Sequence, residues 1–152
     1  MKLEEIVPEY RSKTPFVRKL FLKRLKIALQ LAQPELESNN NLNIIDLGCG
    51  EGIFLKMIEE RFKNVKTFGV DIEPNIIKLK NFLRAEIKVA DIKNTAFPNN
   101  FFDIVFCLDV LEHFEDLERP IGEIKKELQK MDAERKKIEN NLEKILKKIN
   151  FK

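Results

Sequence analysis

Short apolar runs alternate with segments of helical periodicity along most of this chain. Runs rich in β-branched and aromatic residues predict buried strands, whereas apolar residues three or four positions apart predict helices. The predicted strands cover residues 43–47, 66–70, 86–90 and 102–108. The predicted helices cover residues 16–32, 53–62 and 74–83, and Pro34 is expected to end the first of them. Strands that alternate with helices in this way predict an α/β fold with a parallel sheet.

The pattern changes toward the C-terminus. Apolar residues recur there at intervals of three and four, which is a heptad pattern, with Arg135 as one charged interruption. The repeat contains Ile121, Ile124, Leu128, Met131, Ile138, Leu142, Ile145 and Ile149. It predicts a long C-terminal helix that begins near Pro120, or a helical hairpin if the helix breaks at Asn140. We therefore divide the chain into a domain over residues 1–119 and a heptad-patterned helical tail over residues 120–152.

Composition narrows the classes of function without selecting one. The chain has 152 residues, which fits one domain and leaves little room for a second. Lys and Arg number 28 against 25 Asp and Glu, and the net charge of +3 is too small to indicate nucleic-acid binding. No run approaches the roughly 18 apolar residues of a transmembrane helix. Cys49 and Cys107 form no CxxC pair, so we expect reduced thiols and a cytoplasmic location.

Three lysines share one face of the first predicted helix. Lys19, Lys23 and Lys26 recur at the helical period, and most of the surrounding residues are apolar. Such a face can attach a helix to an anionic membrane or to nucleic acid, or it can be the solvated side of a helix that packs on the sheet. Of the two readings we expect the solvated face, because runs of charge are usually just solvated.

A glycine-rich turn links the first predicted strand to the helix that follows. Gly48, Gly50 and Gly52 alternate with other residues in this turn. Glycines there let backbone N–H groups approach a ligand closely. The dinucleotide-binding fingerprint needs a third glycine where this chain has Ile53, so a dehydrogenase-type nucleotide module is the weaker alternative. An acid at Asp46 favours instead a cofactor that carries a cationic amine.

Two further acids follow later strands. Asp71 ends the second predicted strand about 20 residues after the turn, where a carboxylate can accept two ribose hydroxyls. Asp91 ends the third strand and is expected at the same edge of the sheet. Ligands of open parallel sheets bind outside the carboxyl ends of the strands, near the switch in strand order. Together with Asp46, these acids and the glycine turn predict one adenosine-sized site.

These residues stand in motifs that resemble a known family. The segments IIDLGCGEG, FGVDIEP and VADIKNTAFPNNFFDIVFCLDVLEHFED resemble the class I S-adenosylmethionine-dependent methyltransferases, type 11-like, over residues 42–114. The resemblance implies a Rossmann-like doubly wound sheet, S-adenosylmethionine as the cofactor, and transfer of its methyl group. The cofactor-binding residues that it implies are Asp46, Gly48, Cys49, Gly50, Gly52, Asp71, Ile72, Asp91, Ile92, Leu108 and Asp109.

The resemblance also implies a role for each group. Asp46 and the glycines surround the methionine part of the cofactor, and Asp71 holds the ribose. Asp91 and the backbone of Ile92 lie at the adenine. The residues that border the sulfonium end are Cys107, Leu108 and Asp109. Two residues of the N-terminal leader resemble residues that cap this site in similar enzymes, namely Tyr10 and Arg11.

His113 is the candidate catalytic residue. Histidine has an ordinary pKa that suits a general base near neutral pH, and similar enzymes often place this residue near the substrate mouth. The reading that we favour is a histidine at a helix start that bonds to backbone. Asp109, Glu112 and His113 also resemble a metal set of small-RNA 2′-O-methyltransferases, but that set needs a downstream histidine, and this chain has one histidine only. We therefore expect no metal.

The resemblance stops where similar enzymes continue with a Gly-Gly turn, a fifth strand and a final hairpin. This chain has Met131-Asp132-Ala133 at the Gly-Gly position, and no later segment has a strand pattern. We therefore expect a C-terminally truncated sheet of four strands in the order 3-2-1-4, with strand four as an apolar edge. The expected cover for that edge is the tail itself, the second copy of a homodimer, or a partner chain.

Two functions stay open at this point. The first is a methyltransferase-like enzyme that binds S-adenosylmethionine and transfers its methyl group, by in-line displacement, to an acceptor that the sequence does not identify. The alternative is a non-catalytic or remnant methyltransferase-fold subunit that assembles through its C-terminal helix. The acceptor cannot be inferred, because the strands that select it in similar enzymes are missing here.

Overall fold

The structure is a computed structural model that describes residues 15–128. Its helices and strands, including two short 3₁₀ helices, are α1 (Pro15–Ser38), β1 (Leu42–Leu47), α2 (Ile53–Arg61), β2 (Val65–Asp71), η2 (Pro74–Asn81), β3 (Glu86–Val89), β4 (Ile104–Phe106), η3 (Leu111–His113) and α3 (Glu118–Glu127). No helix within this described part is both long enough and apolar enough to span a lipid bilayer.

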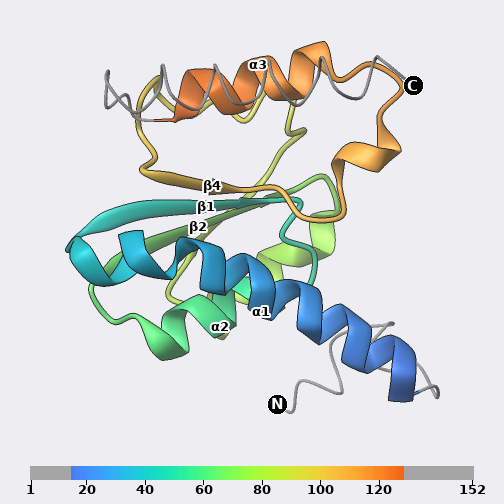
Figure 1. Cartoon of the computed structure of the whole chain (residues 1–152). Coiled ribbons are helices and arrows are strands. Elements are labelled where there is room, and N and C mark those ends of the chain that lie inside the picture. The colour runs from blue at the N-terminus through green and yellow to red at the C-terminus, as the bar shows by residue number, and fades with distance from the viewer. Residues whose placement is uncertain (1–14, 129–152) are drawn as a thin grey trace, which may run out of the picture.

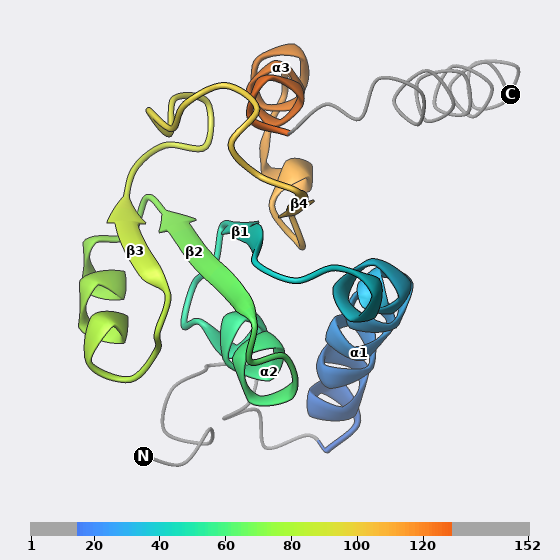
Figure 2. The ribbon, with the colours of Figure 1, turned by 90° about the vertical axis from the view of Figure 1, so that its left-hand side faces the viewer.

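The four strands form one parallel sheet in the order β3-β2-β1-β4, which confirms the expected order. β1 pairs with β2 along six residues, from Leu42 opposite Val65 to Leu47 opposite Val70. Its pairing with β4 covers only residues 44–46. α1 and α2 lie on one face of the sheet and α3 lies on the other (Figures 1 and 2). This arrangement is the Rossmann-like fold that the motifs predicted.

The alternation of side chains along β1 supplies residues to both faces. Ile44 packs with the helices α1 and α2, whereas Ile45 and Leu47 pack on the opposite face. Asp46 is two residues after Ile44 and therefore points to the α1 side of the sheet. The core on this side includes Leu25, Leu29, Leu36, Phe54 and Ile58.

Phenylalanine rings fill the opposite face. Phe102 is fully buried, and its ring centroid lies 5.2 Å from that of Phe68 and 5.0 Å from those of Phe97 and Phe101. These contacts are edge-to-face, the geometry that the ring quadrupoles favour. Ile124 of α3 packs against this cluster. The first residues of the predicted tail are therefore part of the packed body.

Pro34 does not end the first helix as expected, because α1 continues to Ser38. The missing N–H of a proline costs one backbone hydrogen bond, but two interactions hold the last turn. The Ser38 hydroxyl donates to the carbonyl of Pro34 at 2.7 Å, and Leu36 is buried in the core. Tertiary packing thus outweighs the local helix-breaking tendency.

The fourth strand is shorter than predicted: β4 includes only residues 104–106 of the predicted range 102–108. Phe102 instead forms an isolated parallel bridge with Leu128, and the Asp103 N–H donates to the carbonyl of Asn43 at 2.9 Å. After β4 the chain leaves the sheet and reaches Asp109, which has a positive φ of 55°. The third predicted helix also differs, since η2 is a 3₁₀ helix that begins at Pro74.

The C-terminal helix exists, but it is not one unbroken helix over the heptad pattern. α3 ends at Glu127, and Leu128 is extended, with φ −63° and ψ 128°. The Asn100 N–H donates to the carbonyl of Lys126 at 2.9 Å, so this end of α3 lies beside the residues that precede β4. The other heptad positions, and Tyr10 and Arg11, lie outside the described residues. The division into a domain and a tail stays a prediction.

Candidate functional site

The glycine turn between β1 and α2 needs glycine for two separate reasons. Gly48 has a φ of +78° and Gly52 a φ of +71°, a backbone region that residues with a Cβ rarely adopt. A Cβ added to Gly48 would lie 2.1 Å from Cγ2 of Val110. The N–H groups of Gly48 and Cys49 both donate to the carbonyl of Val70, at 2.7 and 2.9 Å. The turn is therefore anchored to the end of β2.

Asp71 at the end of β2 is held beside this turn. The Gly50 N–H donates to its Oδ2 at 2.9 Å, and the Glu73 N–H donates to its Oδ1 at 3.0 Å. A carboxylate oxygen has more than one acceptor site, so both oxygens can still accept bonds from a ligand. The Ala90 N–H donates to the carbonyl of Asp71 at 3.0 Å, which brings the chain after β3 alongside. The expected grouping of strand ends is therefore present.

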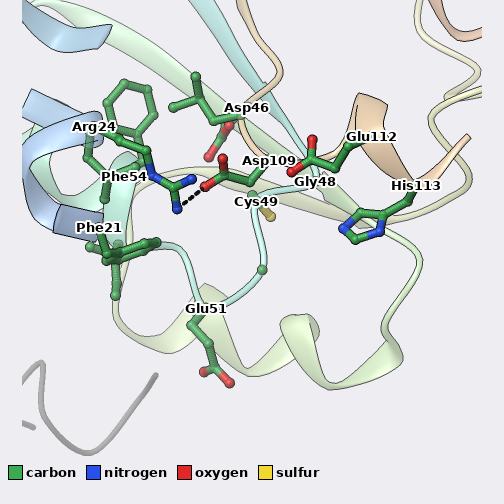
Figure 3. Close-up of a pocket in the computed structure, with 14 residues that line it drawn as sticks. Phe21, Arg24, Asp46, Gly48, Cys49, Glu51, Phe54, Asp109, Glu112 and His113 are labelled. Atoms are coloured by element: carbon green, nitrogen blue, oxygen red, sulfur yellow. Dashed lines mark ion pairs between the residues drawn. The ribbon is translucent and has the colours of Figure 1, made fainter. Parts of the chain in front are cut away.

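A cavity of about 410 Å³ opens between the glycine turn, α1 and the residues after β4 (Figure 3). This size is within the range of small-molecule sites. Its walls are formed by Phe21, Arg24, Leu25, Asp46, Gly48, Cys49, Gly50, Glu51, Ile53, Phe54, Leu108, Asp109, Glu112 and His113. Seven of the predicted site residues therefore share one cavity, namely Asp46, Gly48, Cys49, Gly50, Leu108, Asp109 and His113.

Asp46 is a buried carboxyl group without a hydrogen-bond partner in the described part of the chain. Only 4% of the residue is exposed, and it lines the cavity. Burial, followed by the nearby charge of Asp71, raises the pKa of Asp46 to about 8. Buried polar groups are nearly always satisfied, so an unpaired one indicates a missing partner. A cation placed in the cavity would supply that partner and lower the pKa.

Arg24 reaches the same cavity from α1. Its guanidinium lies 2.8 Å from the carboxylate of Asp109, and about half of the Arg24 side chain is exposed (Figure 3). Among the residues that line the cavity, Arg24 alone carries a fixed positive charge, against the acids Asp46, Glu51, Asp109 and Glu112. The wall of the cavity is therefore mostly acidic, with one cation that a ligand can also use.

The two cysteines are free thiols that stay protonated. Burial raises the pKa of the Cys49 thiol, and the charges of Asp46 and Asp71 raise it further. Burial likewise raises the pKa of Cys107 to about 11, with smaller effects of Asp46 and Glu112. Since the thiolate is the nucleophilic form, neither thiol is activated. Cys49 contributes to the wall of the cavity as a small apolar group.

His113 ends the short helix η3 and is exposed at the wall of the cavity. Its backbone N–H donates to the carbonyl of Val110 at 3.1 Å. His113 and Glu112 both project from η3 (Figure 3). In the described residues no three His, Cys, Asp or Glu side chains are grouped so that they could hold a metal ion.

The remaining predicted residues lie outside the cavity wall. Ile72 follows β2 and is 71% exposed. The Asp91 carboxylate accepts a bond from the Lys93 N–H at 2.9 Å and pairs with its ammonium at 3.3 Å. Ile92 is buried in the phenylalanine cluster, and Gly52 caps α2. Ile72 and Asp91 lie at the strand ends next to Asp71, where a ligand that extends from the cavity would meet them.

Seven wall residues were not among the predicted cofactor-binding or catalytic residues, namely Phe21, Arg24, Leu25, Glu51, Ile53, Phe54 and Glu112. Phe21 and Arg24 are three positions apart on the first helix, so a helical projection places them on one face. The sequence alone does not show that this face turns toward the glycine turn. That information comes from how α1 packs on the sheet.

Comparisons with known proteins indicate one family. The family model of a methyltransferase domain matches residues 45–131. An uncharacterised protein of Methanocaldococcus jannaschii is 33% identical over 99 residues, which are 64% of this chain and 41% of that protein. A malonyl-[acyl-carrier protein] O-methyltransferase of Acetivibrio thermocellus is 29% identical over 87 residues, which are 55% of this chain and 30% of that enzyme.

A solved structure shows the same fold. Coclaurine N-methyltransferase bound to N-methylheliamine and SAH aligns with a TM-score of 0.60 and 21% identity, over 75% of this chain and 33% of that chain. The alignments with these relatives thus cover less than half of each relative's length.

Proposed function

This chain belongs to the methyltransferase-domain family, and on that premise we propose that it binds S-adenosylmethionine and transfers its methyl group to an acceptor. The observation that carries the proposal is the buried Asp46, which has no hydrogen-bond partner among the described residues and lies in the wall of a cavity beside the glycine turn. S-adenosylmethionine has an ammonium group and a positively charged sulfur, and an acidic cavity suits both.

The residues at the strand ends suit the parts of this cofactor. Asp46 would pair with the ammonium group, and Asp71, already oriented by Gly50, would accept bonds from the ribose hydroxyls. Asp91 and the backbone of Ile92 would lie at the adenine. Gly48 and Gly50 both line the cavity, and a Cβ at Gly50 would meet nothing within 4 Å, so the methionine part could lie against the backbone of this turn.

Arg24 completes this assignment at the methionine end of the cofactor. The methionine part also has a carboxylate, which the acids of the cavity would repel. Arg24 is the fixed positive charge in the cavity wall, and its partner Asp109 is half-exposed, so the guanidinium can bond to both. We therefore assign Arg24 to the carboxylate of the cofactor.

When bound, S-adenosylmethionine supplies a methyl group on a positively charged sulfur, which a nucleophilic atom can displace. Leu108 and Asp109 follow β4 and line the cavity, and they would border the sulfonium end. The protein's main contribution is to hold the two reactants in line. His113, which is exposed in the cavity wall, would accept a proton from an acceptor that must lose one. Cys49 and Cys107 stay neutral, so they do not compete with the acceptor for the methyl group.

The test of this proposal is isothermal titration with S-adenosylhomocysteine, the product that remains after methyl transfer. We expect binding at a single site. The chain has a single tyrosine and no tryptophan, so circular dichroism should be used to show that the sample is folded. Folded protein that gives no heat above the buffer signal would contradict cofactor binding.

We propose a second role, assembly through the free side of β4, because β4 pairs only with β1 in the described residues. The isolated bridge to Leu128 is formed by Phe102, before β4 begins. An unpaired apolar strand edge is a site where another chain can add. The heptad tail would form a coiled coil, either in a homodimer or with a partner chain. We also propose a cytoplasmic location, because the two thiols are reduced. Light scattering on the full chain tests the assembly, and a monomer at all concentrations contradicts a homodimer.

A further inference from the structure

The outer face of α1 carries an exposed apolar stripe. Phe16, Leu20, Ile27 and Leu31 are exposed by 71, 50, 45 and 80%. At about 100° per residue, these four side chains fall within an arc of roughly 60° along the helix. The opposite side of α1 packs into the core through residues such as Leu25. α1 is therefore apolar on two sides, and one of them has no partner in the described structure.

A row of lysines runs along one side of this stripe. Lys19, Lys23 and Lys26 are all exposed, and the helical period places them directly beside the apolar side chains. The sequence has no Asp or Glu between Pro15 and Pro34. The outer face of α1 is thus apolar and cationic at once, and the acids of this helix, Glu35 and Glu37, come only after Pro34, more than two turns beyond Lys26.

This combination differs from an ordinary solvated face. Single exposed apolar residues are common on proteins and need no explanation. Four of them aligned on one helix, beside a row of lysines, form the pattern of helices that lie in the headgroup region of a membrane. We propose that the outer face of α1 binds an anionic lipid surface. The apolar side chains enter the headgroup boundary, and the lysine ammonium groups meet lipid phosphates.

The charges of this chain argue against two other occupants. A second copy docked through the same stripe would bring two rows of lysines together, which is repulsive. Residues 129–152 contain eight Lys or Arg against four Asp or Glu, so the predicted tail is also cationic. An anionic lipid surface has the opposite charge and no fixed shape, which suits a convex helix better than a matching groove would.

The location of α1 connects this surface to the cavity. Figure 2 shows α1 at the side of the body opposite β3 and η2. Phe21 and Arg24 of the same helix line the cavity (Figure 3). A membrane bound by α1 would therefore lie beside the cavity, whereas η2 would face away from it.

Sedimentation of the full chain with lipid vesicles tests the proposal. We expect binding to mixed phosphatidylglycerol–phosphatidylcholine vesicles and none to pure phosphatidylcholine. The triple variant Lys19→Glu, Lys23→Glu, Lys26→Glu should bind at least roughly tenfold more weakly, because each lysine near an anionic surface contributes. The control triple Lys66→Glu, Lys78→Glu, Lys80→Glu changes the net charge equally at exposed positions of β2 and η2 and should stay within about twofold of the native chain.

A fluorescence reporter locates the contact. The chain has no tryptophan, so a single substitution gives an unambiguous signal. Phe16→Trp should shift its emission to the blue with phosphatidylglycerol vesicles. Phe82→Trp, at a position 56% exposed next to η2, should not shift.

Four results would overturn the proposal. The first is that the native chain does not bind anionic vesicles, and the second is that the two lysine triples lose vesicle binding equally. The third is that the emission of the two tryptophans shifts equally. The fourth is that light scattering shows a dimer, which the double variant Leu20→Ser, Leu31→Ser dissociates. The last result would assign the stripe to a second copy. All variants change exposed side chains, and an unchanged thermal midpoint confirms that they fold.

Discussion

β1 is paired more extensively with β2 on one side than with β4 on the other. On one side, six residue pairs join β1 to β2, and the pair ends in a glycine turn bonded to Val70 and Asp71. On the other side, only three pairs join β1 to β4, and the chain then reaches an exposed ion pair between Arg24 and Asp109. The side that would hold the adenosine therefore has more backbone pairs and hydrogen bonds than the side that would face the acceptor. Substitutions should therefore cost most on the β2 side.

The largest effect is expected at the glycine turn. Gly48→Val should abolish S-adenosylhomocysteine binding and lower the free energy of unfolding by about 3 kcal/mol or more, because it combines a positive φ with a clash against Val110. Urea denaturation and titration calorimetry measure the two effects. If Gly48→Val kept the free energy of unfolding of the native chain, the turn would accommodate a side chain, and the expected clash with Val110 would be wrong.

The matched control is the glycine in α3, on the β4 side. A Cβ at Gly122 would meet nothing within 4 Å, and the residue lies inside a helix. Gly122→Ala should therefore leave binding unchanged and raise the free energy of unfolding by up to about 1 kcal/mol, since alanine favours a helix. A loss of stability as large as at Gly48 would remove the contrast between the two sides.

The second effect concerns two acids that each accept a backbone N–H. Asp71→Asn should weaken S-adenosylhomocysteine binding by roughly 100-fold. The substitution removes the negative charge from the group that would accept the ribose hydroxyls and that already accepts the Gly50 N–H. Asp103 accepts the Asn43 N–H at 2.7 Å, before β4. Asp103→Asn should change stability but leave the affinity within about twofold. Equal losses of affinity would show that the ribose is not held by Asp71.

The third effect is a pH dependence that Asp46 should cause. Its pKa is about 8 when folded and 3.8 in the unfolded chain, so the folded protein keeps a proton that the unfolded chain has lost. The contribution of Asp46 to stability therefore falls as the pH rises from about 4 to about 8 and is constant above that. Asp46→Asn should remove this decline, which thermal unfolding across the pH range measures.

The same group should also make binding depend on pH. The ionised form of Asp46 attracts the ammonium group, so affinity for S-adenosylhomocysteine should rise by up to roughly fivefold between about pH 7 and pH 8. Protons should be released on binding, which calorimetry in buffers of different ionisation enthalpy detects. An equal rise in Asp46→Asn would assign the dependence to another group.

The smallest effect is expected on the β4 side, at Arg24. The ion pair with Asp109 is exposed, so Arg24→Gln should change the free energy of unfolding by less than about 1 kcal/mol. Affinity for S-adenosylhomocysteine should fall by roughly fivefold to tenfold. Affinity for 5′-methylthioadenosine, which lacks the carboxylate, should not change. Equal losses for both ligands would show that Arg24 does not contact the carboxylate.

Sequence patterns predicted the β2 side well because local signals specify it. The apolar run before Asp46, the glycines of the turn and Asp71 at a strand end are each visible within a few residues. The period of two along β1 places Asp46 on the same face as Ile44, and the structure shows that α1 covers this face. The strand order β3-β2-β1-β4 follows from the family resemblance, because this order is part of that fold.

The β4 side was predicted less well because distant contacts determine it. The apolar run of residues 102–108 has a strand pattern, but Phe102 is used in the phenylalanine cluster and in a bridge with Leu128. Pro34 has a helix-breaking tendency that the burial of Leu36 overcomes. The ion pair of Arg24 joins residues 85 positions apart, and no local pattern indicates such a contact.

The most direct test of the central proposal is a crystal structure of the chain with S-adenosylhomocysteine. The ammonium group should lie within hydrogen-bond distance of the Asp46 carboxylate, with both ribose hydroxyls on Asp71 and the methionine part against Gly48. A ligand bound elsewhere, or one bound here with Asp46 still unpaired, would contradict the assignment of this cavity.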